Sequence, residues 1–211
     1  MCLIVAKPRA GRWDLDLLRA AAINNPHGAG LSWAAAGSLY TVRKMTFEQL
    51  EPALETAARY PAVLHLRYAT HGEMTVANVH PFYVAGRKDL LFAHNGIINS
   101  LPRHKELSDT RLFNRDVLSK LPDRFEESSK FLQAMASATS SRFAFLRRDG
   151  RWFLAGAYHV KQGCHYSNYS YVTYTPTGVE PSGYDSCYVD ETSGQLRFAE
   201  TVEGRSVTWR R

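Results

Sequence analysis

Apolar residues occur along this chain in short blocks that predict alternating strands and helices. Three mainly apolar runs, at residues 2–7, 62–67 and 90–93, indicate buried strands. Leucines and alanines at helical spacing predict a helix over residues 13–23, with Asp14 as its N-cap. The chain is therefore expected to begin with a buried strand and to continue into a helix.

Turn-forming residues mark the breaks between these blocks. The segment 24–30 contains two asparagines, a proline and two glycines, and is expected to form a loop. A short strand is predicted over residues 38–43. Thr46 and Gln49 form a capping-box signature, so a helix is expected from this point to about residue 59.

The second half of the chain predicts two successive helices followed by strands. The helices are expected over residues 108–120 and 124–138, and Asp149-Gly150 is a strong β-hairpin signal. Strands are predicted at residues 142–146, 152–157, 169–174, 186–189, 196–199 and 206–209. Strands, then consecutive helices, then strands again predict an α+β fold, in which helices pack outside antiparallel sheets.

Composition places the chain among ordinary globular proteins. Its 211 residues predict one large domain, and 45% hydrophobic with 22% charged residues is typical of a folded core with a polar surface. No stretch approaches the ~20 apolar residues that a membrane span needs, and no secretory signal is visible. The three cysteines do not make a disulfide framework. These observations predict a cytoplasmic protein without a membrane partner.

No metal or cofactor is expected. His159, Cys164 and His165 lie close together in the sequence, but their spacing fits no zinc pattern and a fourth ligand is not evident. Cys164 is more simply explained as a small buried hydrophobic residue.

The basic charge leaves contact with nucleic acid open. The net charge is +6, but the lysines and arginines are scattered rather than clustered. Four tyrosines are spaced along the segment 166–174, at Tyr166, Tyr169, Tyr171 and Tyr174. This spacing indicates one face of a strand more simply than a surface on which bases stack. The exposed edges of two sheets leave self-association or docking of a partner open as well.

The chemistry of the chain centres on Cys2. If Met1 is removed, a thiol and a free α-amine share one residue, so the nucleophile carries its own base. An α-amine has a pKa of about 7.7 to 8.0 and a cysteine thiol one of about 8.5. The amine is therefore partly neutral at cellular pH and can take the thiol proton. The alternative is a buried cysteine that only begins the first strand.

Polar residues that follow the predicted strands supply further candidates. Arg67 ends a buried strand, where its guanidinium is suited to bind a carboxylate through two hydrogen bonds. Asn95 and Gly96 follow another strand, and a side-chain amide beside a glycine N–H provides two donors for an oxyanion. Loops at strand ends commonly carry catalytic residues, so these positions form a candidate active site.

Five short motifs occur in order along the chain. They are Met1-Cys2, Arg67-Tyr68-Ala69-Thr70-His71-Gly72, His80-Pro81-Phe82, His94-Asn95-Gly96-Ile97-Ile98-Asn99 and Ser108-Asp109-Thr110. Together they resemble the class II glutamine amidotransferases, whose glutaminase domains belong to the N-terminal nucleophile hydrolases. The resemblance is firm from residue 2 to about residue 120, and residues 149–150 and 166–168 resemble parts of small standalone members.

The resemblance implies a four-layer α-β-β-α sandwich with two stacked antiparallel sheets. It implies that residues 1–211 form a single glutamine amidotransferase domain from which Met1 is removed. Residues 176–211 are expected to be a C-terminal β extension that completes or flanks the sandwich.

The resemblance also implies a role for each candidate residue. Cys2 would attack the side-chain amide of glutamine, while Asn95 and the N–H of Gly96 would hold the tetrahedral oxyanion. Arg67 would bind the substrate carboxylate and Asp109 its ammonium group.

Residues around these groups are expected to shape the site. Thr70 and His71 would form part of the glutamine pocket. His27, Gly28 and Gly30 would belong to a flap over the nucleophile, although turn formation is the alternative for the glycines.

Structural alternatives exist for the charged and histidine residues as well. Arg67 and Asp109 would each contribute about 0–1 kcal/mol in exposed salt bridges. Asp109 is by itself a good helix N-cap, and His80 before Pro81 is expected to be structural rather than catalytic.

The preferred hypothesis is a standalone glutaminase that releases ammonia from L-glutamine through a Cys2 thioester. The ammonia would pass to a separate synthetase or modifying enzyme, including one that modifies nucleobases or nucleotides. The alternatives are an amidohydrolase for γ-glutamyl or related amides and a non-catalytic glutamine-sensing or binding protein. Arg111 stands where many family members carry an acidic residue, and it would alter the surface toward an acceptor partner.

Overall fold

The computed structural model describes residues 2–172, 186–189 and 196–199. The structure divides into two units at residue 173, and each unit is described by itself. The first unit contains all the candidate site residues. In the second unit, β11 (Ser186–Val189) and β12 (Leu196–Ala199) pair as antiparallel strands. They match the two strands predicted for this region, whereas residues 206–209 lie outside the described residues. The role of residues 176–211 stays a prediction.

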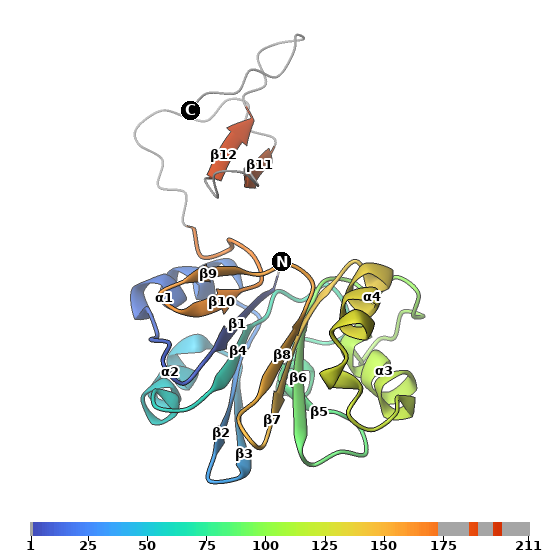
Figure 1. The fold of residues 1–211 in the computed structure, drawn as a ribbon. Coiled ribbons are helices and arrows are strands. Elements are labelled where there is room, and N and C mark those ends of the chain that lie inside the picture. The colour runs from blue at the N-terminus through green and yellow to red at the C-terminus, as the bar shows by residue number, and fades with distance from the viewer. Residues whose placement is uncertain (1, 173–185, 190–195, 200–211) are drawn as a thin grey trace, which may run out of the picture. The chain divides into compact units, whose positions relative to one another are not determined.

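The N-terminal strand lies inside a six-stranded antiparallel sheet (Figure 1). Helices α1 (Leu15–Asn24) and α2 (Phe47–Ala57) cover its outer face, begun by the predicted N-caps Asp14 and Thr46. The hydrogen-bonded strand order is β3 (Ser38–Lys44), β2 (Ala29–Ala35), β4 (Ala62–Leu66), β1 (Leu3–Lys7), β10 (Cys164–Tyr166) and β9 (His159–Lys161).

A four-stranded sheet carries the second half of the sandwich. Its strand order is β5 (Phe82–Tyr83), β6 (Leu90–Asn95), β7 (Arg142–Arg147) and β8 (Trp152–Ala155). Helices α3 (Asp109–Asp116) and α4 (Ser129–Thr139) pack on its outer face through a phenylalanine-rich core. Short 3₁₀ turns occur at Val76–Asn78, Leu118–Lys120 and Phe125–Glu127.

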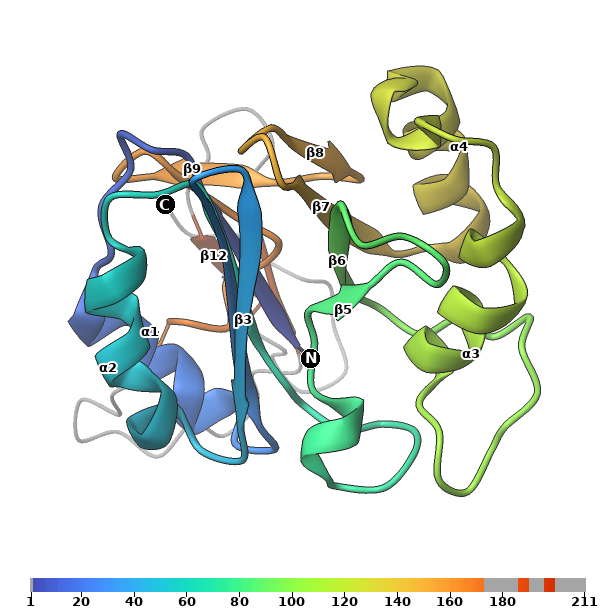
Figure 2. The ribbon, with the colours of Figure 1, turned by 90° about the horizontal axis from the view of Figure 1, so that it is seen from below.

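Small apolar side chains join the two sheets face to face. The shared core contains Ile4, Ala6 and Val63 from the first sheet and Ala93 and Ala144 from the second. Figure 2 shows α1 and α2 on one side of the stacked sheets and α3 and α4 on the other. The predicted α+β fold, a four-layer α-β-β-α sandwich with antiparallel sheets, is therefore confirmed.

The predicted loop over residues 24–30 is wrong at its end, because Ala29 and Gly30 belong to β2. Most of β2 consists of alanine, glycine and serine, which have little intrinsic strand preference. The strand forms because β3 and β4 supply hydrogen-bond partners on both of its edges. Gly30 is required there because a Cβ atom would lie 1.7 Å from the His80 carbonyl oxygen.

The predicted strand over residues 169–174 is also wrong for the part that the structure describes. Residues 169–172 form bends and a turn, and the ring of Tyr169 stacks on His159 at 3.8 Å between centroids. The predicted helices over residues 108–120 and 124–138 each divide into a 3₁₀ turn and an α-helix. Helical periodicity did not reveal these breaks.

Three histidines from different segments meet in the buried region between the sheets. The rings of His65 on β4 and His80 lie 4.1 Å apart, and those of His80 and His94 lie 6.3 Å apart. His94 on β6 shares hydrogen bonds with the hydroxyls of Thr110 and Ser141. Burial lowers the pKa of His65 to about 3 and that of His94 to about 4. These histidines are therefore neutral in the folded protein near pH 7.

We expect the free energy of unfolding to fall as the pH drops below about 6.5, the pKa of histidine in an unfolded chain. The folded-state pKa of His65 is lower, so the unfolded chain binds more protons in this window and acid favours unfolding. Neither ring nitrogen of His65 has a hydrogen-bond partner among the described residues, so His65→Phe is expected to fold. Between pH 7.5 and 5, the wild-type chain should lose about 2 kcal/mol more stability than His65→Phe.

Urea denaturation of both chains at the two pH values measures this difference. His104→Phe, at an exposed loop position, is the control that removes a histidine outside the buried cluster. Equal losses of stability in the wild-type and His65→Phe chains would show that His65 is not the group responsible.

Candidate active site

Strand pairing places Cys2 beside Arg67. β1 and β4 are antiparallel with Leu3 opposite Leu66, so the next pair along the ladder is Cys2 and Arg67. The half-buried thiol lies against the backbone of Tyr68, whose N–H donates to Cys2 Sγ at 3.2 Å. The same sulfur lies 3.3 Å from the Tyr68 carbonyl oxygen, which can accept the thiol proton. The thiol therefore faces the polar loop after β4 and is not packed in the apolar core.

Charges on two other elements influence the Cys2 thiol. Burial raises its pKa above the ordinary value, and this effect outweighs the opposing effects of the Tyr68 N–H and the Arg67 charge. The negative charge of Asp109 raises it further. Burial lowers the pKa of Arg67, and the charges of Cys2 and Asp109 offset only part of this lowering. Cys2, Arg67 and Asp109 thus lie within electrostatic reach of one another.

Ser167 links Asn95 to the N-terminal strand. Asn95 ends β6 and is 1% exposed, and its Nδ2 donates to Ser167 Oγ at 2.9 Å. The same hydroxyl accepts the Ile4 N–H at 2.8 Å. Beside it, Asn168 Nδ2 donates to the Cys2 carbonyl oxygen at 2.7 Å. Two polar side chains after β10 therefore bring the end of β6 to the start of β1.

Gly96 has a backbone conformation that favours glycine. Its φ is +148°, and a Cβ atom would lie 2.2 Å from Ser141 Oγ. A larger residue would therefore displace Ser141, which also bonds His94. The close approach to Ser141 explains why a glycine follows Asn95.

The guanidinium of Arg67 organises the loop that follows it. The side chain is 3% exposed, and its two terminal nitrogens donate to the carbonyl oxygens of His71 and Glu73 at 3.1 and 3.2 Å. Asn78 fixes the far side of this loop by donating to the Glu73 and Glu106 carbonyl oxygens. The surface salt bridge considered for Arg67 is therefore wrong, since its observed partners are backbone carbonyls.

Asp109 is the first residue of α3 and not its N-cap. Ser108 is the cap, because its hydroxyl accepts the Arg111 N–H at 3.3 Å. The Asp109 carboxylate instead accepts the N–H groups of Ile98 and Thr110 at 2.9 and 2.8 Å. It thereby ties the loop after Gly96 to the start of α3.

Thr70 and His71 lie on the rim of this region. Thr70 is exposed, and its hydroxyl lies 3.3 Å from His71 Nδ1. His71 and Asp109 both line a small pocket of about 60 Å³, with the loop 98–107 forming the other wall. The structure therefore brings His71 and Asp109 together and leaves Thr70 at the edge.

The segment around His27 contacts the loop after β4. His27 Nδ1 accepts the Ala69 N–H at 2.9 Å, and its ring centroid lies 5.0 Å from that of Tyr68. The Gly28 carbonyl accepts the Arg67 N–H at 2.8 Å. Gly28 and Gly30 permit close approach to Val79 and His80, as Cβ atoms there would clash with this segment. Glycine is therefore required at positions 28 and 30 because residues 79–80 pass too close for a side chain.

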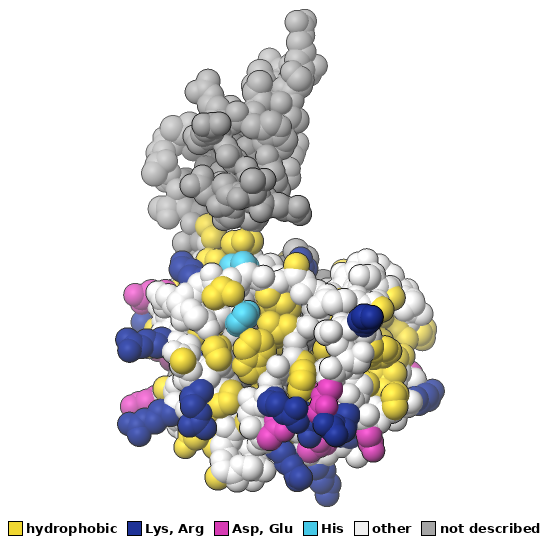
Figure 3. Space-filling view, in the orientation of Figure 1, with side chains coloured by type: hydrophobic (Ala, Val, Ile, Leu, Met, Phe, Trp, Pro, Cys, Tyr) yellow, Lys and Arg dark blue, Asp and Glu magenta, His cyan; other side chains and the backbone are white. Residues whose placement is uncertain are grey.

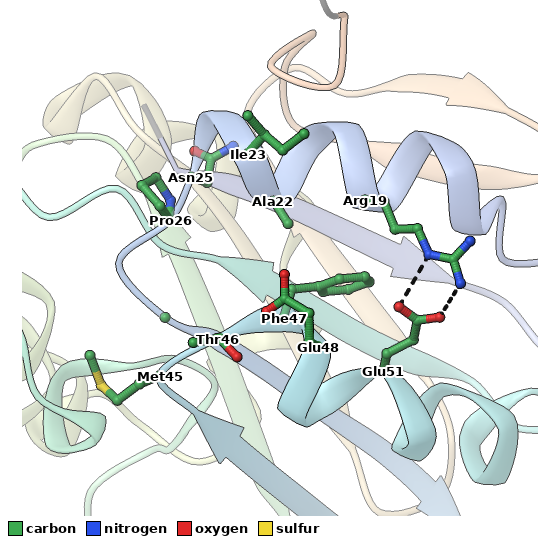
Figure 4. Close-up of a pocket in the computed structure, with 11 residues that line it drawn as sticks. Arg19, Ala22, Ile23, Asn25, Pro26, Met45, Thr46, Phe47, Glu48 and Glu51 are labelled. Atoms are coloured by element: carbon green, nitrogen blue, oxygen red, sulfur yellow. Dashed lines mark hydrogen bonds and ion pairs between the residues drawn. The ribbon is translucent and has the colours of Figure 1, made fainter.

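A larger hollow lies between α1 and α2 (Figure 4). It has a volume of about 450 Å³ and includes Gly28 in its wall, but Cys2, Arg67, Asn95 and Asp109 do not line it. Arg19 and Glu51 form an ion pair across one end. This hollow belongs to the outer helical layer.

Sequence reasoning missed Ser167, Asn168 and Asn78 as organisers of the site. The sequence indicates residues 166–168 only as part of a family-like strand, and a lone asparagine such as Asn78 gives no sequence signal. Within the described residues, no three His, Cys, Asp or Glu side chains are grouped so as to hold a metal ion. None of the helices there is long and apolar enough to cross a membrane.

Comparison with known proteins identifies relatives for part of the chain. The family model for glutamine amidotransferases class-II matches residues 54–157. Glutamine--fructose-6-phosphate aminotransferase of Methanococcus maripaludis is 36% identical over 78 residues, which are 36% of this chain and 13% of that protein. The enzyme of the same name from Corynebacterium diphtheriae is 37% identical over 95 residues, which are 43% of this chain and 15% of that protein. The match thus spans less than a sixth of these relatives' length.

Solved structures with a similar arrangement include the glutamine phosphoribosylpyrophosphate amidotransferase of B. subtilis. That likeness covers 69% of this chain and 34% of the other, with 15% identity and a TM-score of 0.43.

Proposed function

Because this chain belongs to the class II glutamine amidotransferase family through residues 54–157, we propose that it hydrolyses L-glutamine with Cys2 as nucleophile. The single observation that supports this most is the position of the Cys2 thiol. It faces a polar loop beside Arg67 and lies within electrostatic reach of Asp109. A cysteine that only began a strand would not need these charged neighbours.

The proposed active chain begins at Cys2. Burial raises the pKa of the thiol, so the sulfur is mostly protonated at neutral pH and needs a base. A free α-amine on the same residue, with a pKa of about 7.7 to 8.0, takes the thiol proton. The thiolate then attacks the amide carbon, and the protonated amine returns its proton to the departing ammonia. Water cleaves the resulting thioester, which releases glutamate and restores the thiol.

We assign stabilisation of the tetrahedral oxyanion to the Asn95 side chain and the Gly96 N–H. Asn95 is fixed by Ser167, and Gly96 by its close approach to Ser141. Preorganised donors of this kind need no rearrangement when charge develops on the oxygen. The link from Asn95 through Ser167 to Ile4 supports this assignment, because it holds Asn95 at a fixed position relative to β1.

Recognition of the zwitterionic end of glutamine is assigned to Arg67 and Asp109. The substrate carries one carboxylate and one ammonium group, so a selective site needs one fixed charge of each sign. Arg67 is held by two loop carbonyls and Asp109 by two N–H groups, so both charges are fixed. Thr70, His71 and the segment of His27, Gly28 and Gly30 would complete the surrounding walls.

Replacing Asp109 by asparagine should raise the KM for glutamine about 10- to 100-fold, because a hydrogen bond to a charged group contributes about 1.5–3 kcal/mol. The side-chain oxygen of asparagine can still accept one of the two N–H groups, so the loop should remain folded. Glutaramate, which is glutamine without its α-amino group, provides the critical comparison. Its hydrolysis should change little in Asp109→Asn, since it has no ammonium group to lose.

Steady-state ammonia release measures both substrates. Asp116→Asn is the matched control on the same helix, where the carboxylate pairs with Arg115 at the surface. An equal loss of activity toward glutamine and glutaramate would show that Asp109 acts on the fold of the loop and not on the ammonium group.

We further propose that the released ammonia is used by a separate acceptor enzyme, such as a synthetase or a nucleobase-modifying enzyme. The proposal includes a cytoplasmic location, which the low cysteine content supports. An amidohydrolase for γ-glutamyl amides remains the second candidate, because Arg67 and Asp109 would anchor the amino-acid end of either substrate.

The test is ammonia release from L-glutamine by purified protein whose mass shows that it begins at Cys2. Hydrolysis of γ-glutamylmethylamide is measured beside it. Faster turnover of glutamine supports the glutaminase, and faster turnover of the methylamide supports the second candidate. Glutamine binding without turnover of either compound would support a glutamine-binding protein and contradict an enzymatic role.

A further inference from the structure

A second pocket lies where the edge strands of the two sheets meet helix α3. β3 is an edge strand of the first sheet and β5 an edge strand of the second. The pocket has a volume of about 550 Å³, within the ~300–1,000 Å³ usual for small-molecule sites. Its walls include Arg43, Phe82, Arg111 and Arg115.

The charge of this lining is entirely positive. Three of the lining residues are arginines, and none is aspartate or glutamate. Arg115 is neutralised by Asp116, with 2.7 Å between Arg115 Nε and Asp116 Oδ1. Among the residues that the structure describes, neither Arg43 nor Arg111 forms an ion pair. Two positive charges therefore share the pocket without a counter-charge from this part of the chain.

Arg43 and Arg111 are both partly withdrawn from solvent. Both are half-buried, and the Arg43 guanidinium lies 5.5 Å from the centroid of the Phe82 ring. Burial lowers the pKa of Arg43, and the positive charge of Arg111 lowers it further. Both residues lie on regular elements, since Arg43 on β3 pairs with Gly30 of β2 and Arg111 is the third residue of α3.

Two like charges that line one pocket repel each other, and a bound anion would offset this repulsion. A monocarboxylate supplies only one negative charge, whereas a phosphate ester carries about −1.5 to −2 at pH 7 and three acceptor oxygens. Two guanidinium groups match this charge, and each offers a fork of N–H donors to phosphate oxygens. The pocket is also larger than a phosphate ion alone would require.

From this pocket we infer that the protein binds a phosphate-bearing small molecule between β3, β5 and α3, with Arg43 and Arg111 holding the phosphate. The site is separate from the candidate glutaminase residues, none of which lines it. It therefore does not depend on the proposed function. An extended nucleic acid is the competing ligand, which the compact pocket favours less than a small molecule.

Calorimetric titration of the full chain with inorganic pyrophosphate, without added divalent metal, tests this inference. One pyrophosphate should bind per chain, and acetate at the same concentration should give no saturable binding. Arg43→Gln and Arg111→Gln should each weaken pyrophosphate binding about tenfold or more, which corresponds to about 1.4 kcal/mol. Arg111→Lys should retain part of the affinity, because it keeps the charge but loses the fork of donors.

Arg59→Gln is the matched control, because Arg59 is exposed, carries the same charge and does not line the pocket. Thermal melting verifies that each variant is folded. Parallel titrations with AMP, glucose 6-phosphate and a single-stranded oligonucleotide separate the sources of phosphate. Binding of the oligonucleotide alone, an equal loss in Arg59→Gln, or no saturable pyrophosphate binding by the folded chain would overturn the inference. Because binding is measured and not turnover, the titration is equally informative in Cys2→Ala.

Discussion

Replacing Cys2 by alanine should reduce glutamine hydrolysis by at least about 10³-fold, the range seen when a covalent nucleophile is removed. The reason is that the thioester cannot form without the Cys2 thiol. Cys164, the other described free cysteine, is fully buried and bonds the Arg12 carbonyl instead. Ammonia release from mass-verified proteins gives the comparison.

Two matched variants make the result specific. Cys164→Ser changes a thiol in the same sheet and should leave turnover within a few-fold of the wild-type rate. A chain that retains Met1 keeps the Cys2 thiol but lacks its free α-amine, so it should be nearly as inactive as Cys2→Ala. Substantial turnover by the Met1-containing chain would contradict the assignment of the α-amine as the base.

Replacing Asn95 by alanine should lower kcat/KM for glutamine by about 10²- to 10³-fold, because one oxyanion donor contributes about 2.7–4 kcal/mol to transition-state stabilisation. The side chain ends β6 and is fixed by Ser167, so its donor is already in place before the substrate binds. The loss should appear mainly in kcat, since the charge on the oxygen develops only in the transition state.

The variant Ser167→Ala tests whether Asn95 acts on the oxyanion or only positions β6 relative to β1. It removes the hydroxyl that connects Asn95 with the Ile4 N–H, while the Asn95 amide remains. We expect a loss of about tenfold, clearly smaller than that of Asn95→Ala. If Asn95→Ala melts like the wild-type chain and keeps kcat within a few-fold, the oxyanion role is wrong. If the two variants lose the same activity, Asn95 acts only by joining β6 to β1.

Acidic pH should lower the stability of the folded sandwich as well as affecting catalysis. The buried histidines lie close to Arg67 and Asp109, which contribute to their electrostatic environment. Loss of activity below about pH 6.5 therefore needs comparison with loss of folding, because acid favours the unfolded chain, in which these histidines are protonated.

Local sequence patterns were sufficient to predict those elements whose signals are complete within a few residues. The apolar run of β1, the caps Asp14 and Thr46, and the Asp149-Gly150 hairpin needed no distant partner to be identified. The family motifs likewise predicted the layer order that the structure shows. Signals of this kind depend on local conformation and on the side chains of adjacent residues.

Contacts between distant groups, in contrast, could be known only from the folded chain. β2 has weak strand preference and exists because β3 and β4 pair with it, and Gly30 is needed only because His80 passes close by. The pairing of Cys2 with Arg67 and the contact of Asn95 with Ser167 depend on strand register and on stacking of the sheets. These relations join residues far apart in the chain, and no local pattern encodes them, because hydrogen bonds between strands form only when the whole sandwich packs.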